Sequence, residues 1–488
     1  MAYKDLREFI QRLESAGELR RIRTEVDPEL EIAEIANRVV KAGGPALLFE
    51  KVKGHEVPVL TNHFGSPRRM AWALGVEDIE EIRRRIEGLV KQRPPSSLGD
   101  RMRAARELLR LASYAPRTVA RGPCQEVVED PPNLNAFPAL KTWPDDGGRF
   151  VTLPMVFTRH PETGQRNVGM YRMHIYDSRT TGMHWHPQKV GAMHYRAYER
   201  LGRRMPVAVA LGGDPAMTYA ATAPLPEDID EVVFAGFLRQ KAVEVVKCQT
   251  CDLEVPADAE IVMEGYVEPG ERRLEGPFGD HTGYYSPAEE YPVFHIERIT
   301  HRRDPIWPAT VVGPPPMEDC YLGKATERIF LPLLQVMLPE IVDLNLPIVG
   351  VFHNLALVSI RKSFPGQARK VMQGLWGTGQ MMFTKVIVVV DEDVNVQGGQ
   401  EVLWKALNSI DPQRDILFVE GPVDALDHAA PQPLMGSKMG VDATRKWPQE
   451  GYQRQWPGEL KMDEAVRRRV DELWSALGLP AEARRQDA

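Results

Sequence analysis

The chain has 488 residues, of which 43% are hydrophobic and 26% are charged, and its formal net charge is −7 at pH 7. This length can bury two or three sizeable cores, and the acidic balance argues against a general nucleic-acid binder. The sequence has no apolar run long enough to span a membrane and no pattern of a signal peptide at its start, so we expect a cytoplasmic protein.

The first ninety residues predict a small α/β domain. Apolar residues at helical spacing indicate a first helix over 4–17. Asp27 followed by Pro28 is typical of an N-cap and first helical residue, which predicts a helix from there to about residue 40. The remaining predicted elements are strands at 46–49 and 57–61 and helices at 66–75 and 78–91.

A stretch rich in Pro, Ser and Gly at 94–99 predicts a linker. The helix predicted after it, from about 100 to 112, carries several arginines with Glu107 among them. We interpret this helix as a solvated face rather than an RNA-binding surface.

From about residue 125 to 305 the pattern is mostly β, with turn signals at Gly164, Gly213 and Gly270. This predicts an antiparallel barrel that is interrupted by helices near 188–204 and 229–239. The predicted strands cover 151–159, 167–176, 207–211, 243–246, 259–266 and 293–300.

After about residue 310, helices at 322–337, 366–376 and 398–408 alternate with strands at 348–360 and 385–390. The last helix, near 463–477, has a stripe of Val466, Val470, Leu473 and Leu477, and we expect it to dock on a neighbouring subunit. The pattern divides the chain into an N-terminal α/β domain with a linker helix (1–112), a central β domain (113–308), a C-terminal α/β domain (309–460), and an oligomerisation helix with a frayed tail (461–488).

The four cysteines give no disulfide framework. Cys248 and Cys251 form one Cys-x-x-Cys motif, a pattern found in redox and zinc sites. Because no second pair completes a four-thiolate site and the motif follows an apolar strand-like run, we interpret it as structural.

Two segments carry candidate chemistry. Glu275 and Asp280 lie five residues apart around Gly276, Pro277 and Gly279, a spacing that suits either two acids in one cavity or a surface hairpin with a satisfied acid at each end.

The second segment is the predicted strand at 166–172, where alternation puts Asn167 and Tyr171 on one face and Arg172 on the other, mostly apolar face. An arginine in that position needs a carboxylate, from a substrate or from Glu275.

These segments resemble the UbiD family of reversible decarboxylases, which use prenylated flavin mononucleotide. The runs at 3–9, 43–50 and 436–444 also look familial, so the resemblance covers about residues 3 to 477. The chain is most similar in look to the quinone-biosynthesis branch, which decarboxylates polyprenyl-hydroxybenzoate. The resemblance implies an α/β plus β chain whose central domain is a split β-barrel of the flavin-reductase type.

The resemblance implies a catalytic trio of Arg172, Glu275 and Asp280. Arg172 would pair with Glu275 and orient the substrate carboxylate. Asp280, as a buried acid with a raised pKa, would return a proton to the substrate carbon after carbon dioxide leaves.

The family pattern also assigns residues to the cofactor and to a divalent metal, typically manganese, beside its phosphate. Asn167 and Glu231 match two metal ligands, and the third position holds Gln188 where the family has a histidine. His184 or His186 remains an alternative third ligand, or both histidines merely pack beside Trp185. Potassium is a further candidate ion. The residues matched to the cofactor are Met170, Tyr171, Arg172, His184, Trp185, His186, Lys189, Val190 and, near the phosphate, Lys438.

We therefore expect a decarboxylase of an aromatic or α,β-unsaturated acid, with a hydroxybenzoate or naphthoate quinone precursor as substrate. A small heteroaromatic acid, such as a furoate or pyrrole carboxylate, is the alternative substrate. A flavin oxidoreductase and a non-catalytic assembly subunit are the alternative functions. The expected partners are a flavin prenyltransferase and further copies of the chain in a homodimer or homohexamer, with peripheral membrane contact if the substrate is polyprenylated.

Overall fold

The N-terminal region is a four-stranded sheet that a distant part of the chain completes. The computed structural model describes residues 2–91, 98–226 and 228–480. The sheet has the order β1-β2-β3-β18, and its last strand, β18 (Trp307–Pro308), pairs in parallel with β3. The other elements are α1 (Leu6–Ser15), β1 (Leu19–Ile22), α2 (Glu31–Lys41), β2 (Ala46–Phe49), β3 (Val59–Thr61), α3 (Pro67–Ala73), α4 (Glu80–Val90) and α5 (Leu98–Ala112).

Helix α2 begins later than the sequence pattern predicts. Its N-cap is Leu30, at φ 69°, rather than Asp27. The Asp27 carboxylate instead accepts a hydrogen bond from the Glu29 amide at 2.9 Å and forms an ion pair with Lys53 at 2.7 Å. Asp27 is therefore used in a turn before the helix.

The central region is built on a seven-stranded antiparallel sheet. Its order is β10-β17-β14-β11-β7-β8, and β5 also pairs with β17. Strands β8 and β10, at the two ends of this order, are not hydrogen-bonded to each other within the described residues, so the sheet does not close into a barrel. The strands are β5 (Val127–Glu129), β7 (Met155–Arg159), β8 (Arg166–Met170), β10 (Thr180–Gly182), β11 (Met205–Leu211), β14 (Ile261–Glu275) and β17 (Glu289–His301).

Smaller elements surround this sheet and shape the site. The strand predicted over 167–176 is interrupted, because β8 ends at Met170 and β9 (Met173–His174) pairs elsewhere, with β6 (Phe150–Val151). Tyr171 and Arg172 lie in the break. The remaining elements are β4 (Arg117–Val119), α6 (Val190–Arg200), α7 (Pro215–Ala220), α8 (Glu231–Arg239), β12 (Glu244–Lys247), β13 (Glu254–Pro256), β15 (Phe278–Gly279) and β16 (Tyr285–Ser286).

The C-terminal region is a second α/β unit with its own apolar core. Its five-stranded sheet has the order β19-β20-β21-β23-β22, with β20, β21 and β23 parallel. The segment at 348–360 is only partly a strand, because it starts as a 3₁₀ turn (Ile348–Gly350). The elements are α9 (Glu318–Met337), β19 (Ile341–Asn345), β20 (Leu355–Ile360), α10 (Gln367–Trp376), β21 (Val386–Asp391), α11 (Gly399–Ser409), α12 (Pro412–Asp415), β22 (Ile416–Pro422) and β23 (Met435–Asp442).

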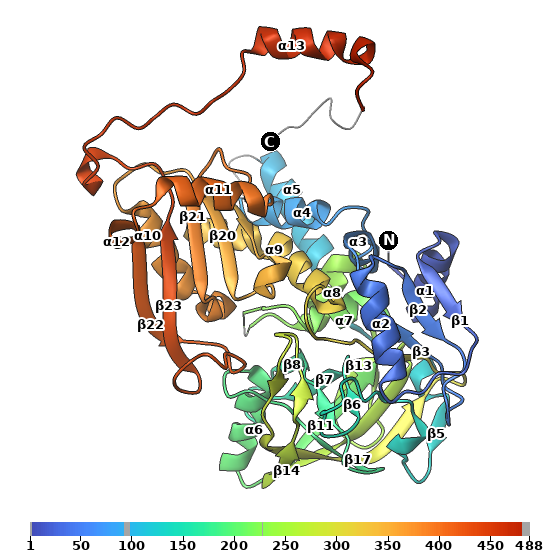
Figure 1. Ribbon diagram of the computed structural model, residues 1–488. Helices are drawn as coiled ribbons and strands as arrows, with labels where there is room; N and C mark the ends of the chain where they lie inside the picture. Colours follow the sequence, from blue (N-terminus) through green and yellow to red (C-terminus); the bar gives the residue numbers. More distant parts are fainter. Residues whose placement is uncertain (1, 92–97, 227, 481–488) are drawn as a thin grey trace.

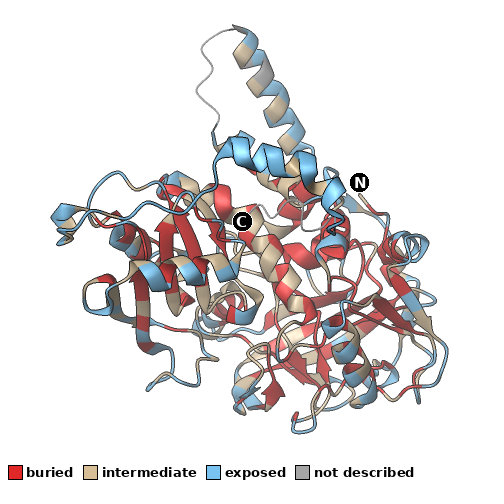
Figure 2. Ribbon diagram, turned by 45° about the horizontal axis from the view of Figure 1, so that its top comes forward, coloured by how far each residue is buried: buried red, intermediate tan, exposed pale blue. Residues whose placement is uncertain are grey.

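The last described helix, α13 (Glu464–Leu473), stands away from these regions at the end of an extended segment (Figure 1). None of its residues is buried, and Figure 2 shows it in the colour of exposed residues. The predicted apolar stripe is exposed, from 38% at Leu473 to 54% at Leu477. In the described part of the chain, no helix combines the length and apolar character that crossing a membrane requires.

Candidate functional site

A buried arginine holds two carboxylates together at the end of β14. Arg172 donates to Glu275 from Nε at 2.8 Å and from Nη2 at 3.2 Å, which is the bidentate geometry that favours a strong pair. Its Nη1 donates to Asp280, and Nη2 also donates to the Ser286 hydroxyl at 2.9 Å. The Arg172 side chain is 9% exposed and that of Glu275 is 0% exposed. The predicted pairing of Arg172 with Glu275 is confirmed.

A short hairpin that follows Glu275 carries Asp280. Strands β15 and β16 pair into a short hairpin, and the Phe278 ring lies 4.6 Å from the Arg172 guanidinium. A side chain at Gly279 would meet Trp143 at 2.2 Å, so this position accepts only glycine. The segment is thus a hairpin, as one interpretation of the sequence has it, but its acids face inward to Arg172 rather than to solvent.

The electrostatics of the two acids differ from the sequence expectation. Burial raises the pKa of Glu275, but the hydrogen bond with His184 and the Arg172 guanidinium outweigh burial and hold that pKa at about 2. Burial also raises the pKa of Asp280, yet Arg172 and His281 hold it well below its usual range. The raised pKa expected for Asp280 is therefore wrong for this arrangement, because the shared guanidinium lies between the acids and removes their repulsion.

Asp280 connects to groups that the sequence analysis did not assign to the site. Its Oδ1 lies 2.9 Å from His281 Nδ1, and His281 Nε2 lies 2.9 Å from His353 Nε2 in the C-terminal region. Burial lowers the pKa of His281, but Asp280 more than offsets this and raises it above the ordinary value. His281 therefore holds a proton beside the ionised Asp280 carboxylate.

A further acid, the half-buried Asp319, lies at the start of α9. Burial raises the pKa of Asp319 to about 6. The charge of His281 lowers this pKa, and the charge of Asp280 raises it. Asp319 Oδ2 has no hydrogen-bond partner among the described residues. Asp319 and His353 come from the C-terminal region, and no sequence motif marks either of them.

His184 contacts Glu275, and His186 contacts His184. His184 Nδ1 is 3.0 Å from Glu275 Oε2, and His186 Nε2 is 2.7 Å from His184 Nε2. Burial lowers the pKa of both imidazoles, to about 3 for His186, so both are neutral. Trp185 is buried and packs edge-on against Tyr171, with 6.3 Å between ring centroids.

The two matched metal ligands converge where β8 meets α8. Glu231 is the first residue of α8, and its Oε2 accepts a hydrogen bond from the Val168 amide at 3.0 Å. Asn167 is buried and Glu231 is half-buried. Both act on Tyr171: burial raises the pKa of Tyr171 to about 12, the hydrogen bond with Asn167 lowers it, and the charge of Glu231 raises it. Burial also raises the pKa of Glu231 to about 7. An amide and a desolvated carboxylate fit a hard divalent cation, which would stabilise the ionised form of Glu231.

The other matched cofactor residues are spread around this area. Met170, Gln188, Lys189 and Val190 are half-buried. Burial lowers the pKa of Lys189, and the charge of Asp424, on the segment that follows β22, opposes that shift. A ring contact of 4.3 Å between Tyr284 and His428 also brings this C-terminal segment to the site.

Lys438 lies on β23. It is buried, donates to the Met382 carbonyl, and has its Nζ 6.0 Å from the centre of the Trp376 ring. No contact among the described residues joins it to Asn167 or Glu231, so its role at the phosphate stays a prediction.

Three domain families match the chain in succession. They are the N-terminal domain (residues 10–88), the Rift-related domain (117–315) and the C-terminal domain (320–443) of 3-octaprenyl-4-hydroxybenzoate carboxy-lyase. An uncharacterized protein of Archaeoglobus fulgidus is 55% identical over 98% of this chain and 99% of its own length. One of Aquifex aeolicus is 49% identical over 98% and 99%.

Solved structures agree with these matches. The closed form of vanillic acid decarboxylase from Sedimentibacter hydroxybenzoicus has a TM-score of 0.86 at 30% identity, covering 98% of this chain and 100% of that one. Its open form has a TM-score of 0.80. The UbiD-class enzyme HmfF from Pelotomaculum thermopropionicum, in complex with prFMN, has a TM-score of 0.78 at 30% identity, covering 95% and 100%.

Proposed function

The chain belongs to the UbiD family and is a decarboxylase, and we propose that it acts without net oxidation on an aromatic or α,β-unsaturated carboxylic acid, with prenylated flavin mononucleotide as cofactor. The observation that carries this proposal is the buried trio of Arg172, Glu275 and Asp280. The trio offers a cation for a substrate carboxylate and a carboxyl group for proton transfer in a site with little water. Hydride transfer, the expected alternative chemistry of an oxidoreductase, has no need of the two acids.

Arg172 is the group we propose to orient the substrate carboxylate. A guanidinium has five N–H donors, and four of those of Arg172 are engaged by Glu275, Asp280 and Ser286. Arg172 holds Glu275 from two nitrogens and Asp280 from one, and each acid also has a histidine partner. A substrate carboxylate would therefore take the remaining N–H and compete with Asp280 rather than with Glu275.

Asp280 is the group we propose to protonate the substrate carbon. Once a substrate carboxylate weakens its contact with Arg172, the pKa of Asp280 rises toward that of a buried acid. His281, 2.9 Å away, is the proton source. The proton would pass from His281 to Asp280 and on to the carbon when the bond to carbon dioxide breaks.

The prenylated flavin would supply the electron sink at the reacting carbon. Met170, Tyr171, Trp185, Lys189 and Val190 are the residues we propose to hold it, and the HmfF complex with prFMN supports this choice of cofactor.

Asn167 and Glu231 would bind manganese or a similar cation near the phosphate. We propose Gln188 as the third ligand, because His186 is engaged with His184.

For the substrate, we propose a hydroxybenzoate or naphthoate quinone precursor, with a small heteroaromatic acid as the second choice. The vanillic acid decarboxylase, a structural neighbour at 30% identity, supports the choice of a hydroxybenzoate. We also propose that α13 docks on a second copy of the chain, since its apolar stripe finds no cover within the described residues.

The decisive experiment compares protein expressed with and without a flavin prenyltransferase. Each preparation is assayed for carbon dioxide release against a panel of aromatic and heteroaromatic acids. We expect turnover only in the flavin-loaded preparation. Equal turnover by protein that carries no flavin would refute the proposal.

A further inference from the structure

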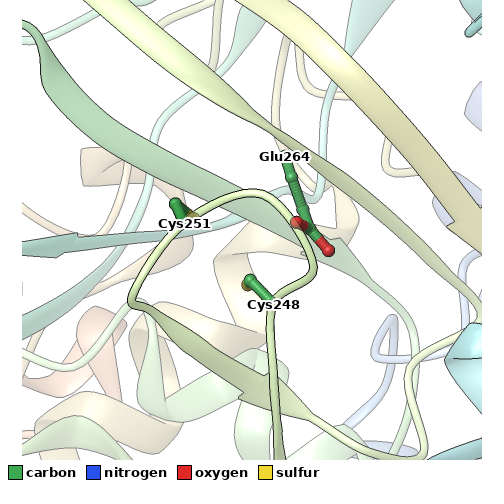
Figure 3. Close-up of side chains that lie close together, drawn as sticks. All are labelled: Cys248, Cys251 and Glu264. Atoms are coloured by element: carbon green, nitrogen blue, oxygen red, sulfur yellow. The ribbon is translucent and has the colours of Figure 1, made fainter.

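Cys248, Cys251 and Glu264 form a compact cluster that the decarboxylase chemistry does not use. The two cysteines flank the turn that joins β12 to β13, and Glu264 reaches into this turn from β14 (Figure 3). Their ligand atoms, two thiol sulfurs and a carboxylate oxygen, all lie within 4.8 Å of one another. Both cysteines are free and half-buried.

Only one of the two oxygens of the Glu264 carboxylate accepts hydrogen bonds. The side chain is fully buried, and its Oε2 accepts hydrogen bonds from the Gln249 amide at 2.7 Å, the Thr250 amide at 2.7 Å and the Thr250 hydroxyl at 2.8 Å. Its Oε1 has no hydrogen-bond partner among the described residues. A buried carboxylate oxygen without a partner is costly, so this side of the cluster lacks a positive group.

The arginine opposite Glu264 in the sheet does not fill that role. Arg298 lies opposite Glu264 in the β14–β17 register, but its Nη1 donates to Gln249 Oε1 at 3.1 Å. The described residues include no ion pair between Arg298 and Glu264, and Arg298 Nε is itself buried without a partner. Arg298, paired with Glu264 across the sheet, would place a positive charge beside a negatively charged metal site without entering it.

We propose that Cys248 Sγ, Cys251 Sγ and Glu264 Oε1 bind a divalent zinc ion. Two thiolates and a carboxylate are a donor set that suits this borderline-soft cation. Tetrahedral zinc with bonds of about 2.0–2.3 Å puts its ligand atoms about 3.3–3.8 Å apart, inside the spacing of this cluster. A Cys248–Cys251 disulfide, by comparison, would leave Glu264 Oε1 unsatisfied.

The fourth ligand is water or a third thiol. Cys124 is fully buried on the 3₁₀ turn Pro123–Gln125, and Gln125 Nε2 donates to the Lys247 carbonyl at 2.8 Å, directly before Cys248. The ion would join the β12–β13 turn to β14, the strand that ends at Glu275 in the active site. We assign the site a structural role, as a cross-link that fixes this strand.

The test uses cobalt, because Co²⁺ bound by thiolate has a charge-transfer band in the ultraviolet. The proposed ligands at Asn167 and Glu231 carry no sulfur, so that site does not contribute to the band. Titration of the reduced full-length protein, first loaded with Mn²⁺, should saturate the band at one equivalent of Co²⁺, and Zn²⁺ should abolish it. The Cys248→Ser/Cys251→Ser variant should lose the band, whereas Cys320→Ser, which changes the buried cysteine on α9, should keep it in full.

A measurement on the unaltered protein keeps the test independent of whether the variants fold. Cys248 and Cys251 are alkylated with and without zinc, and the modified peptides are counted by mass spectrometry. Zinc should protect both cysteines, and a chelator should reverse the protection. Equal alkylation with and without zinc, absence of the cobalt band, its persistence in the double variant, or a Cys248–Cys251 disulfide in zinc-treated protein would each overturn the proposal.

Discussion

Replacing Asp280 by asparagine tests the proton-transfer step most directly. The amide has nearly the shape of the carboxyl group but cannot carry a proton to carbon, and one of its two ends must face a donor, either Arg172 or His281. General acid catalysis is typically worth about 10²–10⁴-fold. Because Asp280 is only 7% exposed, water is a poor substitute for the missing acid. We therefore expect Asp280→Asn to lower product formation by about 10³–10⁴-fold, or about 4–5.5 kcal/mol of barrier.

The assay is formation of the protonated product by flavin-loaded protein over many turnovers, with bound flavin measured by absorbance. A second readout follows deuterium uptake at the product carbon in heavy water, which reports proton transfer without decarboxylation. Asp280→Asn should lose deuterium uptake while keeping its flavin. Ser286→Ala is the matched control, because it removes one hydrogen bond from Arg172 but no charge, and it should cost about tenfold at most. A near-normal rate for Asp280→Asn on the true substrate would refute the assignment and direct attention to Glu275 or His281.

Four further predictions follow from the same site and from the terminal helix. Glu231→Ala should lose bound metal and flavin while keeping the circular dichroism of the folded protein; unchanged elemental analysis would reject the metal role. The pKa of Glu275 is held at about 2, below its ordinary 4.5, so its ionisation stabilises the fold above pH 4.5 by roughly 3 kcal/mol. That contribution is lost as pH falls from about 4.5 to about 2, and urea unfolding should show a steeper acid loss in wild type than in Glu275→Gln. The pKa of His281 is raised, so activity that uses its proton should fall as pH rises above about 6.5, and His281→Gln should lack this alkaline limb. Val470→Asp with Leu473→Asp should reduce the oligomer size measured by light scattering if α13 docks on another subunit; an unchanged mass would argue against that contact.

The sequence was sufficient to identify the three residues of the catalytic trio, but not to predict the protonation state of its acids. Turn chemistry and alternation placed Glu275, Asp280 and Arg172 in interpretable local settings. The lowered pKa of Asp280 depends on Arg172, which lies 108 residues earlier in the chain. A local sequence pattern cannot predict a contact over that separation. Two nearby acids were expected to repel, and a cation placed between them reverses the sign of that effect.

The missed residues share the same cause. His353 and Asp319 reach the site only because the C-terminal region packs on the central one, and this packing depends on tertiary contacts rather than on spacing along the chain. Likewise, β18 joins the N-terminal sheet from a position about 250 residues after β3 along the chain, beyond the reach of any periodicity. The start of α2 was predicted too early for a local reason. The Asp27 carboxylate binds Lys53 and the Glu29 amide and does not cap the helix.

The charges of the site connect substrate binding to proton delivery. Arg172 is one positive charge between the two ionised carboxylates of Glu275 and Asp280, and the neighbouring His184 is neutral. A substrate carboxylate would bring a third carboxylate to the single guanidinium of Arg172, which is unfavourable unless one of the three takes up a proton. The proton on His281 is in position to do this, because it can neutralise Asp280 as the substrate displaces that acid from Arg172. We infer that one proton has two roles. It first neutralises Asp280, which frees Arg172 for the substrate carboxylate, and it is then transferred to the carbon that loses carbon dioxide.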